Sequence, residues 1–202
     1  MVNHKKERGN MFQSKASKLV FIGVLSSISF ILMVLNFPLP GLPPYLKVDF
    51  SDIPALIAVM IFGPIAGITV EAIKNILHFF IQGSATGVPI DQFANFVAGI
   101  LLVVPFSIVF NRLRTLKGAL IGLSVGTVAL TVGMAFLNYF VLLPAYSYLL
   151  NMPPMQSEEV RFLIMTGILP FNLIKGVIVA IMFFLLYNKL IKPLERRMAY
   201  KS

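Results

Sequence analysis

The long apolar runs of this chain constrain its fold more than any other feature. The last run extends from Phe162 to Leu190, and before Asn188 and Lys189 near its end only Asn172 and Lys175 interrupt it with strongly polar side chains. A run of this kind is typical of a helix that crosses the roughly 30 Å hydrocarbon core of a bilayer. Similar runs recur along the 202 residues, of which 57% are hydrophobic, and the mean hydropathy is +0.86. The sequence therefore predicts an all-α integral membrane protein.

The positions of the basic residues predict the orientation of the chain. Most of the 17 lysines and arginines fall in three groups: Lys5, Lys6, Arg8, Lys15 and Lys18; Arg112, Arg114 and Lys117; and Lys189, Lys192, Arg196, Arg197 and Lys201. Cytoplasmic loops are enriched in positive charge, so we expect all three groups and both termini on the cytoplasmic side. The acidic residues Asp49, Asp52, Asp91, Glu158 and Glu159 are expected in external loops. The net charge of +9 then fits contact with the lipid bilayer, and we expect no nucleic-acid partner.

Residues 53–81 decide the number of crossings. They form either one kinked helix or two helices that turn back at Gly63-Pro64. One helix gives five crossings and places the basic group at 112–117 opposite the amino terminus. Two helices give six crossings and keep the three basic groups on one side. We therefore predict six transmembrane helices, of which one is short, roughly 15 Å at about 1.5 Å per residue.

The whole chain, residues 1–202, is predicted to form a single membrane domain. A cytoplasmic leader over residues 1–17 precedes a six-helix bundle over residues 18–190, and a basic cytoplasmic tail over residues 191–202 follows. The proline-rich segment 38–44 ends the first span, because proline cannot continue a helix. Ser51 or Asp52 is expected to cap the next helix.

Several function classes lack the residues that they need. There is no G-x-x-x-x-G-K-[ST] phosphate loop, so we expect no ATP hydrolysis by this chain in the usual way. Cysteine is absent and the only histidines are His4 and His78, so we expect no metal site. No serine, histidine and acid combination suggests a nucleophile. The chain is therefore predicted not to be an enzyme, with no catalytic residue and no cofactor.

Polar side chains within the predicted spans are the candidate functional residues. They are costly in lipid and usually face a cavity, a partner or a bound molecule. Asn95, Asn138 and Asn172 lie at similar predicted depths in the outer half of the membrane, and Lys175 is one helical turn from Asn172. Side-chain amides both donate and accept, which suits a heterocycle with alternating carbonyl and N–H groups. The alternative is a structural role in which neighbouring helices satisfy these groups.

A polar stripe follows one face of the third predicted helix. Glu71, Lys74, Asn75 and His78 are spaced three and four residues apart, which places them on the same side. The stripe is either an internal ion pair, joining Glu71 to Lys74 or Lys175, or part of a pocket wall.

Small residues form two faces that allow close helix approach. Gly118, Gly122 and Gly126 recur every four residues and are expected to pack within the subunit. Gly23 and Ser27 form a shorter face on the first helix. That face serves either an internal contact or the docking of another protein.

A block of residues between the first loop and the third helix resembles a known family. It reads Tyr45-x-Lys47-x-Asp49-Phe50-Ser51-Asp52-Ile53-Pro54-Ala55-Leu56, then Phe62-Gly63-Pro64-x-x-Gly67, then Lys74-Asn75. This block is similar to the riboflavin-specific substrate-binding subunits, or S components, of energy-coupling factor (ECF) transporters, the RibU type. The resemblance implies a six-helix S-component fold in the plasma membrane of a prokaryote. It also implies high-affinity riboflavin capture for an ATP-driven importer.

The resemblance further implies the partners and the binding residues. The partners are one transmembrane coupling (T) protein and two cytoplasmic ATPases. In the family the flavin binds from outside, beneath the first external loop and among helices four to six. The residues carried over to this sequence are Asn138, Asn172 and Lys175, with Tyr45, Leu46 and Lys47 in the loop.

Two further implications concern docking and specificity. The family's first helix meets the coupling protein through an Ala-x-x-x-Ala face, and the matching positions here are Gly23 and Ser27. Two alternatives to riboflavin capture remain. One is an S component for another vitamin, such as thiamine or a biotin precursor, and the other is a riboflavin facilitator that works without partners.

Overall fold

The structure is a computed structural model that describes residues 14–187 and 189. Its elements are almost all helical: α2 (Lys15–Val34), β1 (Phe37–Pro38), β2 (Lys47–Val48), α3 (Asp52–Phe62), α4 (Pro64–Gln82), α5 (Ile90–Leu113), α6 (Leu116–Leu137), η1 (Asn138–Leu142), α7 (Leu143–Leu149), α8 (Ser157–Leu163), η2 (Ile164–Ile168) and α9 (Leu169–Leu186). The predicted leader up to residue 13 and the whole predicted tail lie outside the described residues.

The helical membrane character predicted from the sequence is confirmed. Five helical segments in the described part of the chain are long and apolar enough to cross a membrane: Lys15–Val34, Pro64–Gln82, Ile90–Leu113, Leu116–Leu149 and Ser157–Leu186. Helix α3 is apolar but has only 11 residues. The sixth crossing, which would be made by α3, therefore stays a prediction.

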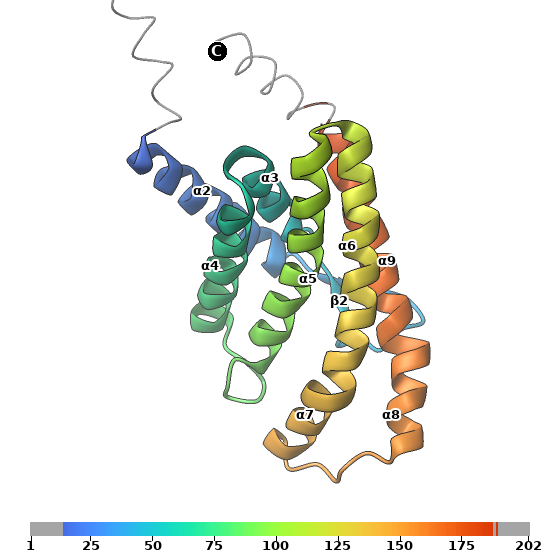
Figure 1. Ribbon diagram of the computed structural model, residues 1–202. Helices are drawn as coiled ribbons and strands as arrows, with labels where there is room; N and C mark the ends of the chain where they lie inside the picture. The colour runs from blue at the N-terminus through green and yellow to red at the C-terminus, as the bar shows by residue number, and fades with distance from the viewer. Residues whose placement is uncertain (1–13, 188, 190–202) are drawn as a thin grey trace, which may run out of the picture.

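The predicted turn at Gly63-Pro64 is confirmed. Gly63 has a φ of 89°, a left-handed conformation that glycine adopts without a steric penalty. Pro64 then begins α4, at a position where the missing N–H costs nothing. As a result α3 and α4 lie side by side instead of forming one helix (Figure 1). Of the two residues expected to cap α3, Ser51 occupies the N-cap position, but its side chain makes no capping hydrogen bond.

Helices α5 and α6 pack closely through two of the predicted glycines. A Cβ atom at Gly126 would lie 2.6 Å from the carbonyl oxygen of Leu102, and one at Gly122 would lie 3.0 Å from that of Phe106. These contacts confirm that the glycine face packs within the subunit. Gly118 differs, because its nearest neighbour is the side chain of Leu113, the last residue of α5.

Two π-helical turns interrupt the long carboxyl-terminal segments. The turn η1 directly precedes α7, which has Pro144 in its first turn, and η2 directly precedes α9, which has Pro170 in its first turn. Proline lacks an N–H, and its ring clashes with the carbonyl four residues earlier. A wider π turn accommodates the ring while the helix continues. The first π turn begins at Asn138, one of the predicted binding residues.

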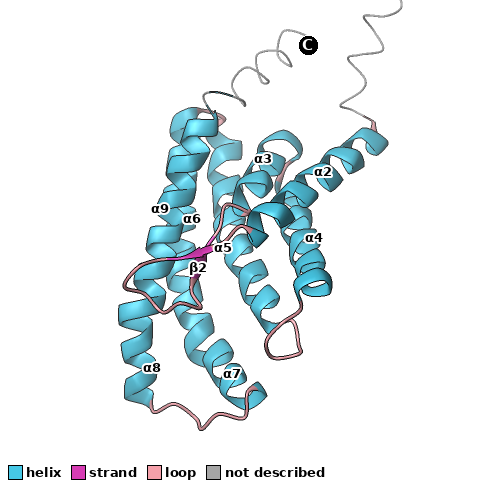
Figure 2. Ribbon diagram, turned by 180° about the vertical axis from the view of Figure 1, so that it is seen from behind, coloured by secondary structure: helices cyan, strands magenta, loops and turns pink. Residues whose placement is uncertain are grey.

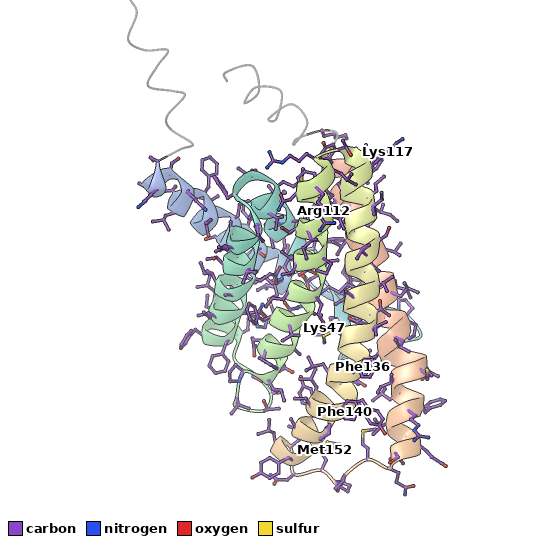
Figure 3. The ribbon with its side chains drawn as sticks, viewed as in Figure 1. Lys47, Arg112, Lys117, Phe136, Phe140 and Met152 are labelled. Carbon is purple, nitrogen blue, oxygen red and sulfur yellow. The ribbon has the colours of Figure 1, made fainter. Side chains whose placement is uncertain are left out.

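The two ends of the molecule differ in charge. The start of α2, the turn between α5 and α6 and the end of α9 lie at the same end, and α7 and α8 extend to the other (Figures 1 and 2). Arg112 and Lys117 are at the first of these ends (Figure 3). The described basic groups therefore lie together, as the charge pattern predicted. We refer to this end as the basic end and to the opposite end, which the charge pattern predicts to be external, as the outer end.

The first loop folds into the molecule instead of covering its outer end. It crosses the bundle at mid-height, where β2 lies beside α9 (Figure 2). Its two short strands pair in antiparallel fashion, with Phe37 opposite Val48. Pro43 packs against η2. A Cβ atom placed on Gly167 in η2 would lie 3.4 Å from Pro43 Cγ. The loop is thus held between η2 and the start of α3.

Candidate functional site

Five charged side chains form a buried network at the junction of the first loop with the bundle. None of them is more than 4% exposed. They are Asp49 in the loop, Asp52 in α3, Glu71 and Lys74 in α4, and Lys175 in α9. Buried charges are stable only when they are paired and hydrogen-bonded. The network therefore fixes how the loop and three helices meet.

Lys74 has three close polar contacts inside this network. Its Nζ donates hydrogen bonds to Ser51 Oγ and Asp52 Oδ1, both at 2.7 Å, and forms an ion pair with Glu71 Oε2 at 2.7 Å. An ammonium has three N–H donors, and these three contacts surround it. The hydroxyl of Ser29 in α2 donates to the carbonyl of Ser51, which connects a further helix to the same point.

Lys175 is held more loosely than Lys74. Its Nζ lies 3.2 Å from Asp52 Oδ2 and 3.9 Å from Asp49 Oδ2. The predicted ion pair between Glu71 and Lys74 is confirmed, whereas Lys175 pairs with Asp52 and Asp49 instead of Glu71. The two aspartates, which were expected in an external loop, are buried, at 2% and 4% exposure, and Asp52 is the first residue of α3.

Asn172 lies one turn along α9 from Lys175, in the direction of the outer end. It is buried, and its Nδ2 donates to the carbonyl of Ile168 at 2.8 Å. Asn138 is partly buried, and its Nδ2 donates to the carbonyl of Met134 at 2.7 Å. In both residues a backbone contact fixes the amide, and the Oδ1 atom is left as an acceptor.

The two amides lie on neighbouring helices at different depths. Gly176 in α9 faces Thr127 in α6, because a Cβ atom on Gly176 would lie 2.5 Å from Thr127 Cγ2. The helices are antiparallel (Figure 1). Counted from this contact, Asn138 lies farther outward than Asn172 by about seven residues, or about 10 Å along the axis. A ligand that touches both amides must therefore be extended.

An aromatic pair lies next to Asn138. The rings of Phe136 and Phe140 are stacked, with centroids 6.4 Å apart and planes inclined by 10°. They lie one turn apart in the outer half of the molecule (Figure 3). Both are exposed, at 62% and 67%, whereas Asn138 is partly buried. Residues two positions apart on a helix do not face the same side, so the aromatic pair lies on a different face from the amide.

The other predicted binding residues are more dispersed. Asn95 in α5 is partly buried, and its Oδ1 accepts from Asn75 Nδ2 in α4 at 3.3 Å, so it contacts α4. In the loop, Leu46 is half-buried, and Tyr45 and Lys47 are exposed. Lys47 lies at mid-height in the molecule (Figure 3). Partial burial raises the pKa of Tyr45, and its hydroxyl can donate or accept a hydrogen bond.

An open hollow of about 530 Å³ lies at the outer end between α7 and the start of α8. Its lining is Leu143, Pro144, Ser147, Tyr148, Asn151, Met152, Pro154, Met155 and Val160. No predicted binding residue contributes to it. A contact between the Tyr146 hydroxyl and Asp91 joins α7 to α5 nearby.

The small-residue face of α2 points away from the bundle. A Cβ atom on Gly23 would meet nothing within 4 Å, and Ser27 is exposed with its hydroxyl donating to the Gly23 carbonyl at 3.0 Å. The buried side of α2 consists instead of Ile22, Ser26, Ser29 and Met33. The sequence allowed two roles for this face, an internal helix contact or the docking of another protein. Within the described residues, the internal contact is wrong.

Comparison with known proteins identifies the family. The family described as "ECF transporter, substrate-specific component" matches residues 17–187. This chain belongs to that family. The resemblance inferred from the loop and third-helix block is thereby confirmed. Members of the family are substrate-binding subunits of transporters and not enzymes, as predicted for this S component.

Two relatives and one solved structure are similar over almost their whole length. The riboflavin transporter FmnP of Bacillus subtilis (strain 168) is 51% identical over 179 residues, which are 89% of this S component and 94% of the relative. The riboflavin transporter RibU of Staphylococcus aureus (strain TCH60) is 41% identical over 187 residues, which are 93% and 96% of the two chains. A structure titled "Structure and mechanism of the S component of a bacterial ECF transporter" has a TM-score of 0.76 at 39% identity and covers 90% of this chain and 99% of its own.

Proposed function

We propose that this S component is the high-affinity riboflavin-capture subunit of an ATP-driven ECF importer in a prokaryotic plasma membrane. The observation that carries the proposal is its 51% identity with a riboflavin transporter along nearly the full length of both chains. The RibU relative from Staphylococcus aureus supports the same substrate. Riboflavin is therefore favoured over thiamine or a biotin precursor.

The orientation and partners follow from charge and from the family. Six helices cross the membrane, with α3 as the short one, and both termini are cytoplasmic. The shared location of the basic residues supports this arrangement, since cytoplasmic ends are positively charged. The chain has no phosphate loop of its own, so energy comes from a module of one coupling protein and two ATPases.

Riboflavin enters from the outer end and binds against α6 and α9, under the first loop. Asn172 and Lys175 on one face of α9, together with Asn138, supply the polar contacts to the ring. Tyr45, Leu46 and Lys47 contribute from the loop at mid-height. Asn95 has a lesser role, because its amide is engaged with Asn75.

The donor capacity of the two buried lysines supports the choice of Lys175. Lys74 donates to Ser51 and Asp52 and forms an ion pair with Glu71, each at 2.7 Å, and these contacts enclose its ammonium. Lys175 has one acceptor within hydrogen-bonding distance, at 3.2 Å, among the described residues. Two of its N–H groups can therefore bind an acceptor on the substrate.

The absorption spectrum of the purified protein tests the substrate. We expect protein purified in detergent from riboflavin-supplied cells to be yellow and to release riboflavin when denatured. Colourless protein that binds thiamine or a biotin precursor instead would overturn the assignment. In sealed vesicles, this chain alone is expected to bind riboflavin without moving it across. Transport by the chain alone would favour a partner-independent facilitator.

The face of Gly23 and Ser27 is proposed to dock the coupling protein. We expect Ser27→Trp to leave riboflavin binding intact, because the residue is exposed on α2 and far from α9. We expect it to weaken assembly with the ECF module about tenfold or more, about 1.4 kcal/mol, since a large side chain prevents close helix approach. Co-purification of the module and cellular riboflavin uptake measure the effect.

A matched control uses Val128→Trp, at a position on α6 that is 60% exposed. This variant adds the same side chain to another exposed helix face. It is expected to assemble and transport normally. Normal uptake by the Ser27→Trp variant would show that the coupling protein docks elsewhere.

A further inference from the structure

We propose that Asp52 is a positioning residue for riboflavin binding, which holds the Lys175 ammonium where its free N–H groups meet the ligand. The inference rests on the proposed function and adds to it a residue that does not itself touch the substrate. It comes from the way in which one carboxylate is shared between two buried lysines.

The two carboxylate oxygens of Asp52 contact lysines on two different helices. Oδ1 lies 2.7 Å from Lys74 Nζ in α4, and Oδ2 lies 3.2 Å from Lys175 Nζ in α9. Asp52 is also the first residue of α3, where the helix dipole favours a carboxylate. Because Lys74 also donates to Ser51, the residue before Asp52, the position of Asp52 is fixed from one side.

This arrangement makes Asp52 the close anchor for Lys175. A lysine side chain is flexible, and each ammonium hydrogen is directed only by the acceptor that it meets. The other nearby carboxylate, Asp49, is 3.9 Å away, beyond hydrogen-bonding distance. Its Oδ1 already accepts from the backbone N–H of Ser51 at 2.8 Å. Without Asp52, the ammonium would turn toward Asp49 and the loop, away from the face that it shares with Asn172.

The ligand suited to this arrangement has carbonyl acceptors beside an N–H group. Lys175 presents donors, and one turn outward Asn172 presents its Oδ1 acceptor, since its Nδ2 donates to Ile168. A donor and an acceptor held one turn apart recognise the polar edge of a heterocycle such as the riboflavin ring. A displaced ammonium would leave the ring carbonyl without a partner.

The test compares Asp52→Asn with Glu71→Gln in the purified full-length protein. Each variant neutralises one carboxylate that contacts Lys74, but only Asp52 also contacts Lys175. Three properties are measured for each: the riboflavin dissociation constant by flavin fluorescence, the absorption spectrum of the bound flavin, and the unfolding temperature. The spectrum reports whether a cation lies beside the ring, which a purely structural role would not change.

We expect Asp52→Asn to weaken riboflavin binding about tenfold or more, since hydrogen bonds to charged groups are among the stronger ones. We also expect it to shift the spectrum of the bound flavin. Glu71→Gln should lower the unfolding temperature with an affinity and a spectrum near those of the wild type. Asp52→Glu keeps the charge and the folded network but places the carboxylate one methylene farther from the backbone. It should give an intermediate affinity.

Three results would overturn the inference. The first is wild-type affinity and spectrum in Asp52→Asn, and the second is an equal loss of affinity in Glu71→Gln, which would indicate general loosening of the network. The third is wild-type affinity in Asp52→Glu together with a failure of Asp52→Asn to fold. In all three cases, riboflavin binding by the wild-type protein would still support the proposed function. Absence of riboflavin binding by the wild-type protein itself would overturn both proposals.

Discussion

Replacing Lys74 with methionine is expected to lower the free energy of unfolding by about 3–5 kcal/mol. Methionine matches the length of lysine but removes the ammonium, so Asp52 and Glu71 each lose a contact of 2.7 Å. Both carboxylates are buried, and water cannot replace the lost partner. The change is measured by thermal or denaturant unfolding of the purified protein in detergent, followed by circular dichroism.

Two further variants identify the cause of this loss. Lys117→Met removes the same charge at an exposed position at the start of α6 and is expected to unfold like the wild type. Adding Glu71→Gln to Lys74→Met removes one of the unpaired carboxylates and should restore part of the stability. Wild-type stability of the Lys74→Met variant would mean that the network does not hold the helices together.

Replacing Gly126 with valine is expected to destabilise the fold by about 1–3 kcal/mol. A Cβ atom at this position would lie 2.6 Å from the carbonyl oxygen of Leu102, which belongs to the backbone of α5. A backbone atom cannot move aside as a side chain can, so α5 and α6 must separate. The same unfolding measurement detects the loss.

The matched control for this variant is Gly23→Val. It introduces the same side chain into a helix at a position where nothing lies within 4 Å. We expect its stability to be close to that of the wild type. If both variants unfold at the same temperature, the close contact of α5 with α6 does not limit stability.

The helices and their breaks were predictable because their signals are local. Apolar runs of membrane length mark the spans regardless of what they pack against. At Gly63-Pro64 a glycine with positive φ and a proline with no N–H act within two residues, so the turn between α3 and α4 could be predicted. The glycines at 122 and 126 likewise showed their packing role through a spacing of four residues.

The buried network was only partly predictable because its contacts join distant segments. The pair of Glu71 and Lys74 lies within one helix, and its spacing indicated it. Asp49 and Asp52 were expected in an external loop, and no pairing with the lysines of the helices was predicted for them. Their burial depends on how the loop folds against α9, and no periodic pattern in the sequence encodes that. The presence of Lys74 and Lys175 in apolar helices, with only one acid nearby in sequence, was the one available signal.

The π turns were missed for a related reason. A proline in a helix predicts an irregularity near its position, but it does not specify a kink, a break or a wider turn. Before Pro144 and Pro170 the helix continues through a π turn, and the wider turn changes the side to which its residues point. The orientation of Asn138, the first residue of η1, therefore depends on the π turn.

The central claim is that polar side chains on α6 and α9 bind riboflavin in the outer half of the membrane. A riboflavin titration of the purified wild type, Asn172→Leu and Asn111→Leu tests it most directly. Asn111 is a matched control, since its amide bonds to Ser107 at the basic end of α5. We predict tight binding by the wild type and Asn111→Leu, and an affinity lower by at least about tenfold, about 1.4 kcal/mol, in Asn172→Leu. Equal dissociation constants for all three proteins would contradict the claim.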